Sequence, residues 1–236
     1  MAKRKDFDQN QARKFPKRNR QRKEGVRELK VYFLIVCEGE KTEPNYFKSF
    51  PNQVHEFVYD LSFGGGGINT IRVVEEAIKI RDKSSQQFDR VWAVFDKDSF
   101  SAVDFNAAID KGEQNDVNCA WSNEAFELWY LLHFQYRNVS MSRADYEGAI
   151  SKAIADKSGI RTYRYAKNAK DTYADLQRYG SEDDAIRNAK RLSQVHEGSA
   201  YASHNPCTTV YKLVEELRGK NTALNEEIKQ KYEHGE

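Results

Sequence analysis

The segment VWAVFDKDS, residues 91–99, decides the expected fold, because it joins a buried strand to a pair of carboxylates. The five mostly apolar residues Val91–Phe95 are typical of a strand that is buried on both faces, as in a parallel sheet. Asp96 and Asp98 follow at the carboxyl end of this strand, where open α/β sheets bind ligands. Their oxygens suit Mg²⁺, but aspartates here can equally cap the next helix. The motif alone leaves both interpretations open.

Strands and helices alternate around this segment. Further strands are expected at 29–36, 56–63 and 116–122, and helices at 44–50, 69–83, 103–111 and 123–134. Thr42 is the expected N-cap of the first helix, and Gly112 is expected to end the third. The alternation predicts an α/β fold with a mostly parallel four-stranded sheet and helices on both faces.

The remainder of the chain shows only helical patterns. Candidate helices are at 142–156, 170–179, 182–196, 206–217 and 222–232. Asn205 and Pro206 read as the N-cap and first residue of one of them. We therefore expect three parts: a basic tail at 1–27, an α/β core at 28–140, and a helical region packed on the core at 141–236.

Charge is distributed unevenly along the chain. Residues 1–30 carry 12 Lys and Arg against 4 Asp and Glu, whereas the remaining residues carry 26 against 32. The basic tail can contact nucleic-acid phosphates, or it can simply be solvated. The residues expected to make such contacts are Arg13, Lys14, Lys17, Arg18, Arg20, Arg22 and Lys23.

Composition excludes several classes of protein. No apolar run approaches the length of a membrane span, and the N-terminus lacks the apolar segment of a secretory signal. The three cysteines are too widely spaced for a zinc site and are odd in number for a disulfide framework. We therefore expect a cytoplasmic protein that does not associate with membranes.

A second acidic cluster follows the first strand. Glu38, Glu40 and Glu43 come directly after it, just as Asp96 and Asp98 follow the third strand. If the two strands are neighbours in a parallel sheet, these carboxylates approach one another and raise each other's pKa. A divalent cation relieves that repulsion, which favours a metal site. The run of four glycines at 64–67 is expected to be a loop near this edge, with phosphate contact as one interpretation.

Together these motifs resemble a known family. A strand ending in Glu-Gly, then a strand ending in Asp-x-Asp, is similar to the TOPRIM fold of topoisomerases, primases and OLD-type nucleases. The segments at 37–47, 91–99, 122–134 and 205–217 resemble RloB-like proteins of bacterial restriction-modification and abortive-infection loci. The resemblance spans about residues 28–218.

The resemblance implies a nuclease that depends on Mg²⁺ or Mn²⁺ and acts on DNA or RNA as the effector of an antiphage system, with a partner ATPase. It implies Glu38 as general acid, general base or metal ligand, Asp96 and Asp98 as metal ligands, and Glu43 or Glu40 as a further ligand. Phosphodiester cleavage also needs a positive group for the charge that develops. The candidates are Lys97, Lys41, Lys167 and Lys170, and a homo-oligomer is compatible with this reading.

Two residues of the helix at 123–134 have more than one interpretation. Glu127 lies among apolar neighbours, where a carboxylate needs a partner, so it either orders the metal site or pairs with an arginine. His133 is either a hydrogen-bonded core residue or part of the site.

Two other functions compete with the nuclease. A HAD-like phosphatase also has a strand that ends in Asp-x-Asp, with the first Asp as nucleophile and a later acidic pair, for which Asp183 and Asp184 are the candidates. A non-catalytic TOPRIM subunit would bind nucleic acid or regulate a partner ATPase.

Overall fold

The computed structural model describes residues 28–67, 70–98 and 100–234. In chain order, its elements are β1 (Leu29–Cys37), α1 (Thr42–Lys48), β2 (Gln53–Val54), β3 (Phe57–Gly65), α2 (Thr70–Lys83), β4 (Arg90–Asp96), α3 (Ala102–Gln114), β5 (Asn118–Asn123), α4 (Glu127–Leu132), α5 (Arg143–Ser158), α6 (Thr172–Tyr179), α7 (Glu182–Ser193), the 3₁₀ turn η2 (Tyr201–Ser203), β6 (Cys207–Thr208), α8 (Val210–Leu217) and α9 (Thr222–His234). The basic residues expected to contact phosphates lie outside the described residues.

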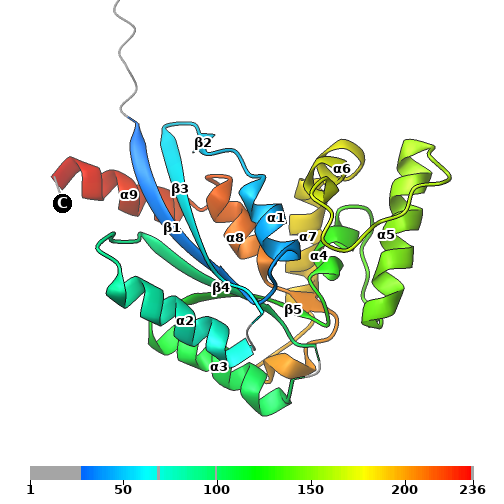
Figure 1. Cartoon of the computed structure of the whole chain (residues 1–236), viewed down its shortest axis with the longest axis horizontal. Coiled ribbons are helices and arrows are strands. Elements are labelled where there is room, and N and C mark those ends of the chain that lie inside the picture. Colours follow the sequence, from blue (N-terminus) through cyan, green and yellow to red (C-terminus); the bar gives the residue numbers. More distant parts are fainter. Residues whose placement is uncertain (1–27, 68–69, 99, 235–236) are drawn as a thin grey trace, which may run out of the picture.

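The strands form one mixed sheet in the order β2-β3-β1-β4-β5-β6. β3, β1, β4 and β5 are parallel, and β2 and β6 add to the two edges in antiparallel orientation. The predicted mostly parallel α/β fold is confirmed, and the four expected strands form its centre (Figure 1). The two edge strands were not predicted, because each has only two residues and shows no periodicity.

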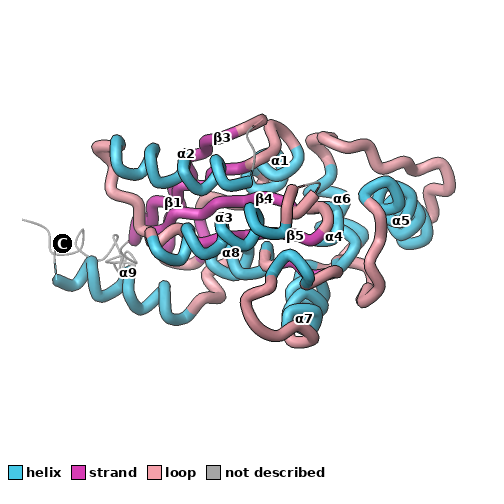
Figure 2. Tube along the Cα trace, turned by 90° about the horizontal axis from the view of Figure 1, so that it is seen from below, coloured by secondary structure: helices cyan, strands magenta, loops and turns pink. Residues whose placement is uncertain are grey.

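Helices cover both faces of the sheet, as predicted. One face packs Leu34, Val36, Ala93 and Phe95 against α2 and α3. The other packs Val31, Phe33, Ile35, Trp92 and Val94 against α1, α4 and the C-terminal helices. The alternation of β1 residues between two apolar layers explains why the strand is apolar at nearly every position. Figure 2 shows α5 at one end of the molecule and α9 at the other.

Gly112 does not end α3, contrary to the prediction. The helix continues to Gln114, and Gly112 is buried within it. A Cβ at Gly112 would lie 2.6 Å from Cys119 Sγ and 2.7 Å from the Val117 carbonyl oxygen. Glycine is therefore explained by the close packing of α3 on the following strand and not by a helix cap.

The helix predicted at 206–217 begins later, at Val210, so that Asn205 and Pro206 do not start it. Cys207 and Thr208 instead pair with the end of β5. The Thr209 hydroxyl oxygen then accepts the N–H of Trp121 at 2.9 Å, which satisfies the strand edge where β6 stops.

Helix α4 is also shorter than the 123–134 predicted. β5 continues through Asn123, and the helix spans only Glu127–Leu132. The intervening backbone has another partner, because the N–H of Phe126 donates to Asp96 Oδ2 at 3.1 Å. Thr42 is likewise not an N-cap: it lies inside α1, and its hydroxyl donates to Asn168 Oδ1 at 2.8 Å.

Residues of the C-terminal helices belong to the same apolar core as one face of the sheet, and this region reaches the carboxyl end of the sheet through Arg143, Lys167 and Asn168. Within the described part of the chain, no helix has both the length and the apolar character needed to cross a membrane.

Candidate functional site: a carboxylate pocket at the end of the sheet

The pairing of β1 with β4 brings the two predicted acidic clusters together. The N–H of Glu38 donates to the Val94 carbonyl oxygen at 2.9 Å, in line with the parallel register of the two strands. Glu38 Oε2 accepts the N–H of Asp96, also at 2.9 Å. The two strands are therefore neighbours, and both clusters lie at the carboxyl end of the sheet, where this class of fold binds ligands.

Asp96 has one oxygen with partners and one without. Oδ2 accepts the N–H of Phe126 and lies 3.5 Å from the guanidinium of Arg143. Oδ1 is buried and has no hydrogen-bond partner among the described residues. A buried acceptor without a partner costs about 1–3 kcal/mol. A proton or a cation at Oδ1 would remove that cost.

Glu43 reaches the same place because Gly39 leaves room for its side chain. A Cβ at Gly39 would lie 2.2 Å from Glu43 Oε2, which is well inside contact distance. Glu43 is buried in the first turn of α1. The Glu-Gly sequence thus contributes to the site in two ways. Glu38 accepts a hydrogen bond from the Asp96 backbone, and the absence of a Cβ at Gly39 leaves space for the Glu43 side chain.

Glu127 is nearly inaccessible, with 2% of its surface exposed. The Tyr165 hydroxyl donates to its Oε1 at 3.3 Å, and Lys167 Nζ lies 3.8 Å from the same oxygen. The sequence left two interpretations of Glu127 open, ordering of the metal site or pairing with an arginine. The observed ion-pair partner of Glu127 is a lysine, Lys167, and not an arginine. Glu127 also lines the pocket that these carboxylates form, so it can order that site through Lys167.

Arg143, the first residue of α5, lines the same pocket although its sequence context does not predict it. Its guanidinium forms ion pairs with Asp98 Oδ2 and with Asp96 Oδ2. Asp98 has a φ of 38°, in the left-handed region that Asp tolerates better than most residues. No local signal identifies Arg143, because it lies 45 residues after Asp98 on a surface helix.

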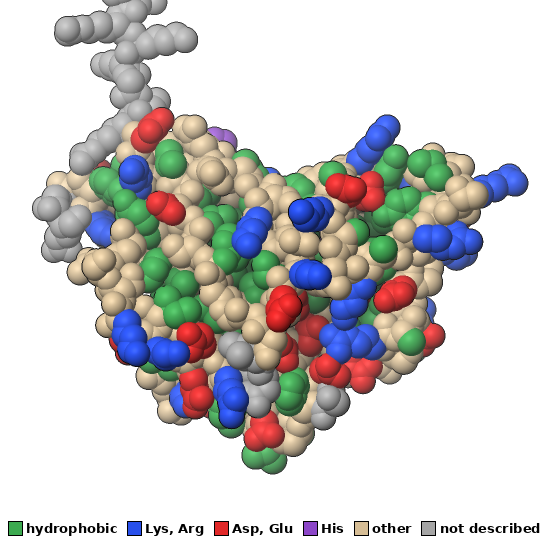
Figure 3. Space-filling model, in the orientation of Figure 1, with side chains coloured by type: hydrophobic (Ala, Val, Ile, Leu, Met, Phe, Trp, Pro, Cys, Tyr) green, Lys and Arg blue, Asp and Glu red, His purple; other side chains and the backbone are tan. Residues whose placement is uncertain are grey.

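These side chains enclose a pocket of about 180 Å³. Its lining residues are Glu38, Gly39, Glu40, Thr42, Glu43, Asp96, Asp98, Phe126, Glu127, Arg143, Lys167 and Asn168. In Figure 3, Lys and Arg side chains gather across the middle of the face, over α1 and the segment that precedes α6, with acidic side chains directly below them. We call the pocket lined by these twelve residues the carboxylate pocket.

Burial and mutual repulsion raise the pKa values of the pocket carboxyls. The pKa of Glu38 rises to about 7, mainly because burial disfavours the charged form and also because of Glu43 and Asp98. Burial raises the pKa of Glu43, and repulsion by Glu127 adds to it. The pKa of Asp96 is well above its usual value for the same reasons, with Arg143 opposing the shift. A cation bound among these carboxyls would lower their pKa values again.

The carboxylate pocket contains donor atoms of the kind that hard divalent cations bind. In the arrangement of the described residues, no three side chains of His, Cys, Asp or Glu converge as a ready-made metal site. The oxygens are nevertheless of the type that Mg²⁺ and Mn²⁺ prefer, and Asp96 Oδ1 lacks any other partner among those residues. Glu38 and Asp96, with Glu43 beside them, are the residues that would hold the ion.

Other predicted site residues are not in the carboxylate pocket. Lys97 Nζ donates to the Phe100 carbonyl oxygen at 2.5 Å and does not line the pocket, and neither does Lys170. His133 is a core residue: its Nδ1 lies 3.0 Å from the Trp129 carbonyl oxygen, and burial lowers its pKa to about 4. Glu40 lines the pocket but is exposed.

The glycines at 64–67 pack and hydrogen-bond against the carboxyl end of β1, where the acidic residues begin. Gly66 N–H donates to the Cys37 carbonyl oxygen at 2.9 Å, and Gly67 N–H donates to that of Glu38 at 2.8 Å. Gly65 has a φ of 83°, and a Cβ there would lie 2.3 Å from the Cys37 carbonyl oxygen. Glycine is therefore needed for close approach of the two strands, and these two N–H groups are already used by carbonyls.

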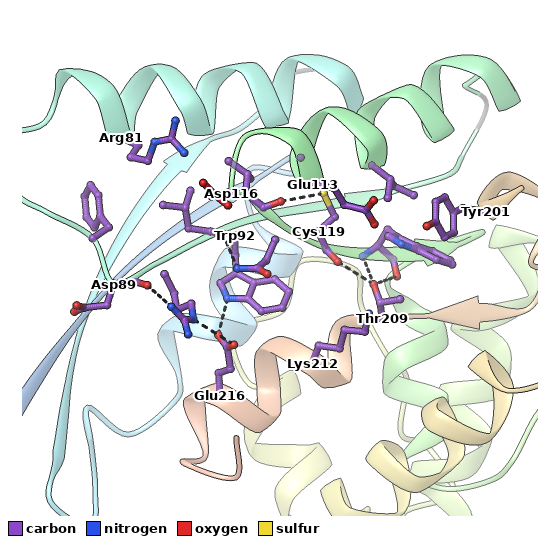
Figure 4. Close-up of a pocket in the computed structure, with 18 residues that line it drawn as sticks. Arg81, Asp89, Trp92, Glu113, Asp116, Cys119, Tyr201, Thr209, Lys212 and Glu216 are labelled. Atoms are coloured by element: carbon purple, nitrogen blue, oxygen red, sulfur yellow. Dashed lines mark hydrogen bonds and ion pairs between the residues drawn. The ribbon is translucent and has the colours of Figure 1, made fainter. Parts of the chain in front are cut away.

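A larger pocket, of about 820 Å³, lies at the amino ends of β4 and β5 (Figure 4). Three of its charged side chains have partners: Glu216 accepts the indole N–H of Trp92 at 2.9 Å and lies 3.6 Å from Arg90, and Arg81 donates to a carbonyl. Burial raises the pKa of Cys119 to about 12, which keeps the thiol protonated. We assign no chemistry to this pocket.

Comparison with known proteins agrees with the motifs. The model of the family described as RloB-like protein matches residues 33–217, most of the chain. The chain belongs to the RloB-like family. No curated protein and no solved structure has a significant match to it. The family match of this RloB-like protein includes the strand ends that carry Glu38 and Asp96 as well as the helical region that supplies Arg143 and Lys167.

Proposed function

We propose that this RloB-like protein is a metal-dependent nuclease that hydrolyses phosphodiesters of DNA or RNA at the carboxylate pocket. The observation that carries the proposal is the state of Asp96. Its buried Oδ1 has no partner among the described residues, and Glu38 is hydrogen-bonded to its backbone. Carboxylate oxygens that are buried together with too little positive charge destabilise the fold. Such an arrangement is more typical of a cation-binding site than of a purely structural cluster.

A bound Mg²⁺ or Mn²⁺ would polarise a phosphoryl oxygen and make a water molecule more acidic. Glu38 would then be an ionised ligand, because a bound cation lowers the pKa of about 7 that this carboxyl has in the metal-free pocket. Lys167 is 39% exposed and lines the same pocket, so its ammonium can stabilise negative charge on the phosphate. Glu127 holds Lys167 in place and acts as a positioning residue.

The biological role that we propose follows from the resemblance to proteins of abortive-infection loci. The nuclease would act as the effector of an antiphage system in the bacterial cytoplasm, controlled by a partner ATPase. The basic residues between Arg13 and Lys23 would add contacts to nucleic-acid phosphates.

The HAD-like alternative loses support because its second acidic pair is elsewhere. Asp183 and Asp184 lie in the first turn of α7 and form ion pairs with Lys220 and Arg187, at 2.5 and 2.6 Å. Neither lines the carboxylate pocket. A phosphatase of that type needs these carboxylates beside the Asp-x-Asp motif.

The proposal is tested by incubating the purified full chain with labelled DNA and RNA, single- and double-stranded, with Mg²⁺, Mn²⁺ or EDTA. We expect cleavage that EDTA abolishes and that falls at least 100-fold in Glu38→Gln and Asp96→Asn. Glu147→Gln is the matched control, because Glu147 is exposed and does not line the carboxylate pocket, and it should retain most of the activity. Cleavage that survives EDTA or Asp96→Asn would contradict the assignment. Absence of both cleavage and cation binding would favour the non-catalytic subunit.

A further inference from the structure

Arg143 occupies the outer side of the Asp-x-Asp pair. Its two terminal nitrogens contact the Oδ2 atoms of Asp96 and Asp98, so one guanidinium bridges both carboxylates. The remaining oxygen of Asp96, Oδ1, has no partner in the described part of the chain. The two sides of Asp96 are therefore unequal, with a permanent cation on one side and a bare oxygen on the other.

We propose that Arg143 takes the place of a second metal ion, so that the carboxylate pocket binds one divalent cation per chain, at Asp96 Oδ1 and Glu38. This inference rests on the proposed function, because it concerns the number of cations at the same site. It assigns Asp98 to Arg143, whereas the family resemblance implies Asp98 as a metal ligand.

The position of Arg143 is built into the fold. Arg143 begins α5, whose Tyr146, Ile150 and Ile154 are buried in the core. A guanidinium stays charged at any pH that a folded protein tolerates and presents its donors in a fixed fork. The charge beside Asp96 and Asp98 is therefore always present, whereas a metal ion at those oxygens would need to displace it.

Electrostatics oppose a second cation while Arg143 is in place. A divalent ion bound between the Oδ2 atoms of Asp96 and Asp98 would share both oxygens with the guanidinium and be repelled by it. An ion at the oxygens that face away from Arg143 does not share them with the guanidinium and is repelled less, because it lies farther away. The same arrangement leaves other N–H groups of Arg143, which is 43% exposed, free to face a phosphate.

The inference is tested by counting bound Mn²⁺ on the full chain at pH 8, by isothermal titration and by the loss of the free-ion signal in electron paramagnetic resonance. Wild type should bind one ion per chain. Arg143→Met, which keeps an unbranched aliphatic stem and removes the charge, should bind two, whereas Arg143→Lys should bind one. Two ions in wild type, or one in a folded Arg143→Met chain, would overturn the inference.

A second pair of variants does not depend on how well Arg143→Met folds. Because Asp98 is paired with Arg143, Asp98→Asn should change the Kd of the single ion less than threefold. Asp96→Asn should raise that Kd at least 30-fold. Equal losses in the two variants would show that Asp98 is a ligand and would overturn the inference. A wild-type chain that binds no Mn²⁺ at all would refute the proposed function itself, and the inference with it.

Discussion

Removing the charge of Glu38 should stabilise the protein in the absence of metal. The pKa of Glu38 is about 7 in the folded chain against 4.5 for an ordinary Glu, so folding costs free energy whenever this carboxyl is ionised. A shift of that size corresponds to at most about 3.5 kcal/mol, since each pKa unit is worth about 1.4 kcal/mol. Because typical domains are stable by only about 5–15 kcal/mol, the effect is large enough to measure.

The sign of the pH dependence follows from where the proton binds. The folded state holds the Glu38 proton more tightly than the unfolded state does, so this group contributes its full stability below about pH 4.5. That contribution is lost as the pH rises from about 4.5 to about 7 and is constant above. The raised pKa values of Glu43 and Asp96 act in the same direction.

The assay is urea unfolding of wild type, Glu38→Gln and Glu40→Gln in EDTA at pH 5 and pH 8. Glu38→Gln keeps an oxygen that can accept the N–H of Asp96. It should exceed wild type by about 3 kcal/mol at pH 8 and by less than about 1 kcal/mol at pH 5. Saturating Mg²⁺ should stabilise wild type and reduce this advantage. The reasoning fails if Glu38→Gln gains nothing at pH 8, gains equally at both pH values, or is matched by Glu40→Gln.

Gly65→Ala should destabilise the fold by about 3 kcal/mol, because the added Cβ would meet the Cys37 carbonyl oxygen at 2.3 Å with φ at 83°. Gly159→Ala has a similar φ of 75° and open space around the Cβ, so it should cost only about 1 kcal/mol, and equal losses in urea titrations would contradict the close-approach argument. Cys119 should resist iodoacetamide at pH 8 in the native protein, because burial raises its pKa to about 12; rapid labelling, read by mass spectrometry, would disprove this. Replacing the seven basic residues between Arg13 and Lys23 by Gln should weaken nucleic-acid binding and lower its salt dependence by several units of the log–log slope. An unchanged slope would place the phosphate contacts elsewhere.

The centre of the sheet could be predicted because β1 and β4 are apolar at nearly every position. β1 and β4 read as buried strands, and their ends bring Glu38 and Asp96 together in the structure. Element boundaries were less predictable wherever a tertiary partner replaced a local signal. Gly112 reads as a helix end but is a packing contact, and Pro206 reads as a helix start but precedes an edge strand.

The candidate site likewise contains residues that the sequence predicts and residues that only tertiary packing brings in. Glu38, Glu43, Asp96 and Asp98 follow from the sequence, because parallel strands deliver whatever follows them to one edge of the sheet. Arg143 does not follow, since its relation to Asp98 depends on how α5 packs against the core.

The sequence by itself determined the alternation of strands and helices and the acidic residues that follow β1 and β4, because periodicity and the order of elements along the chain are local properties. Only the tertiary structure decided how those charges are balanced. Arg143 and Lys167 come from the helical region, far along the chain, and they reach Asp98 and Glu127 through long-range packing. The tertiary structure also leaves Asp96 Oδ1 buried without a partner among the described residues, and this oxygen is the proposed ligand of the divalent cation.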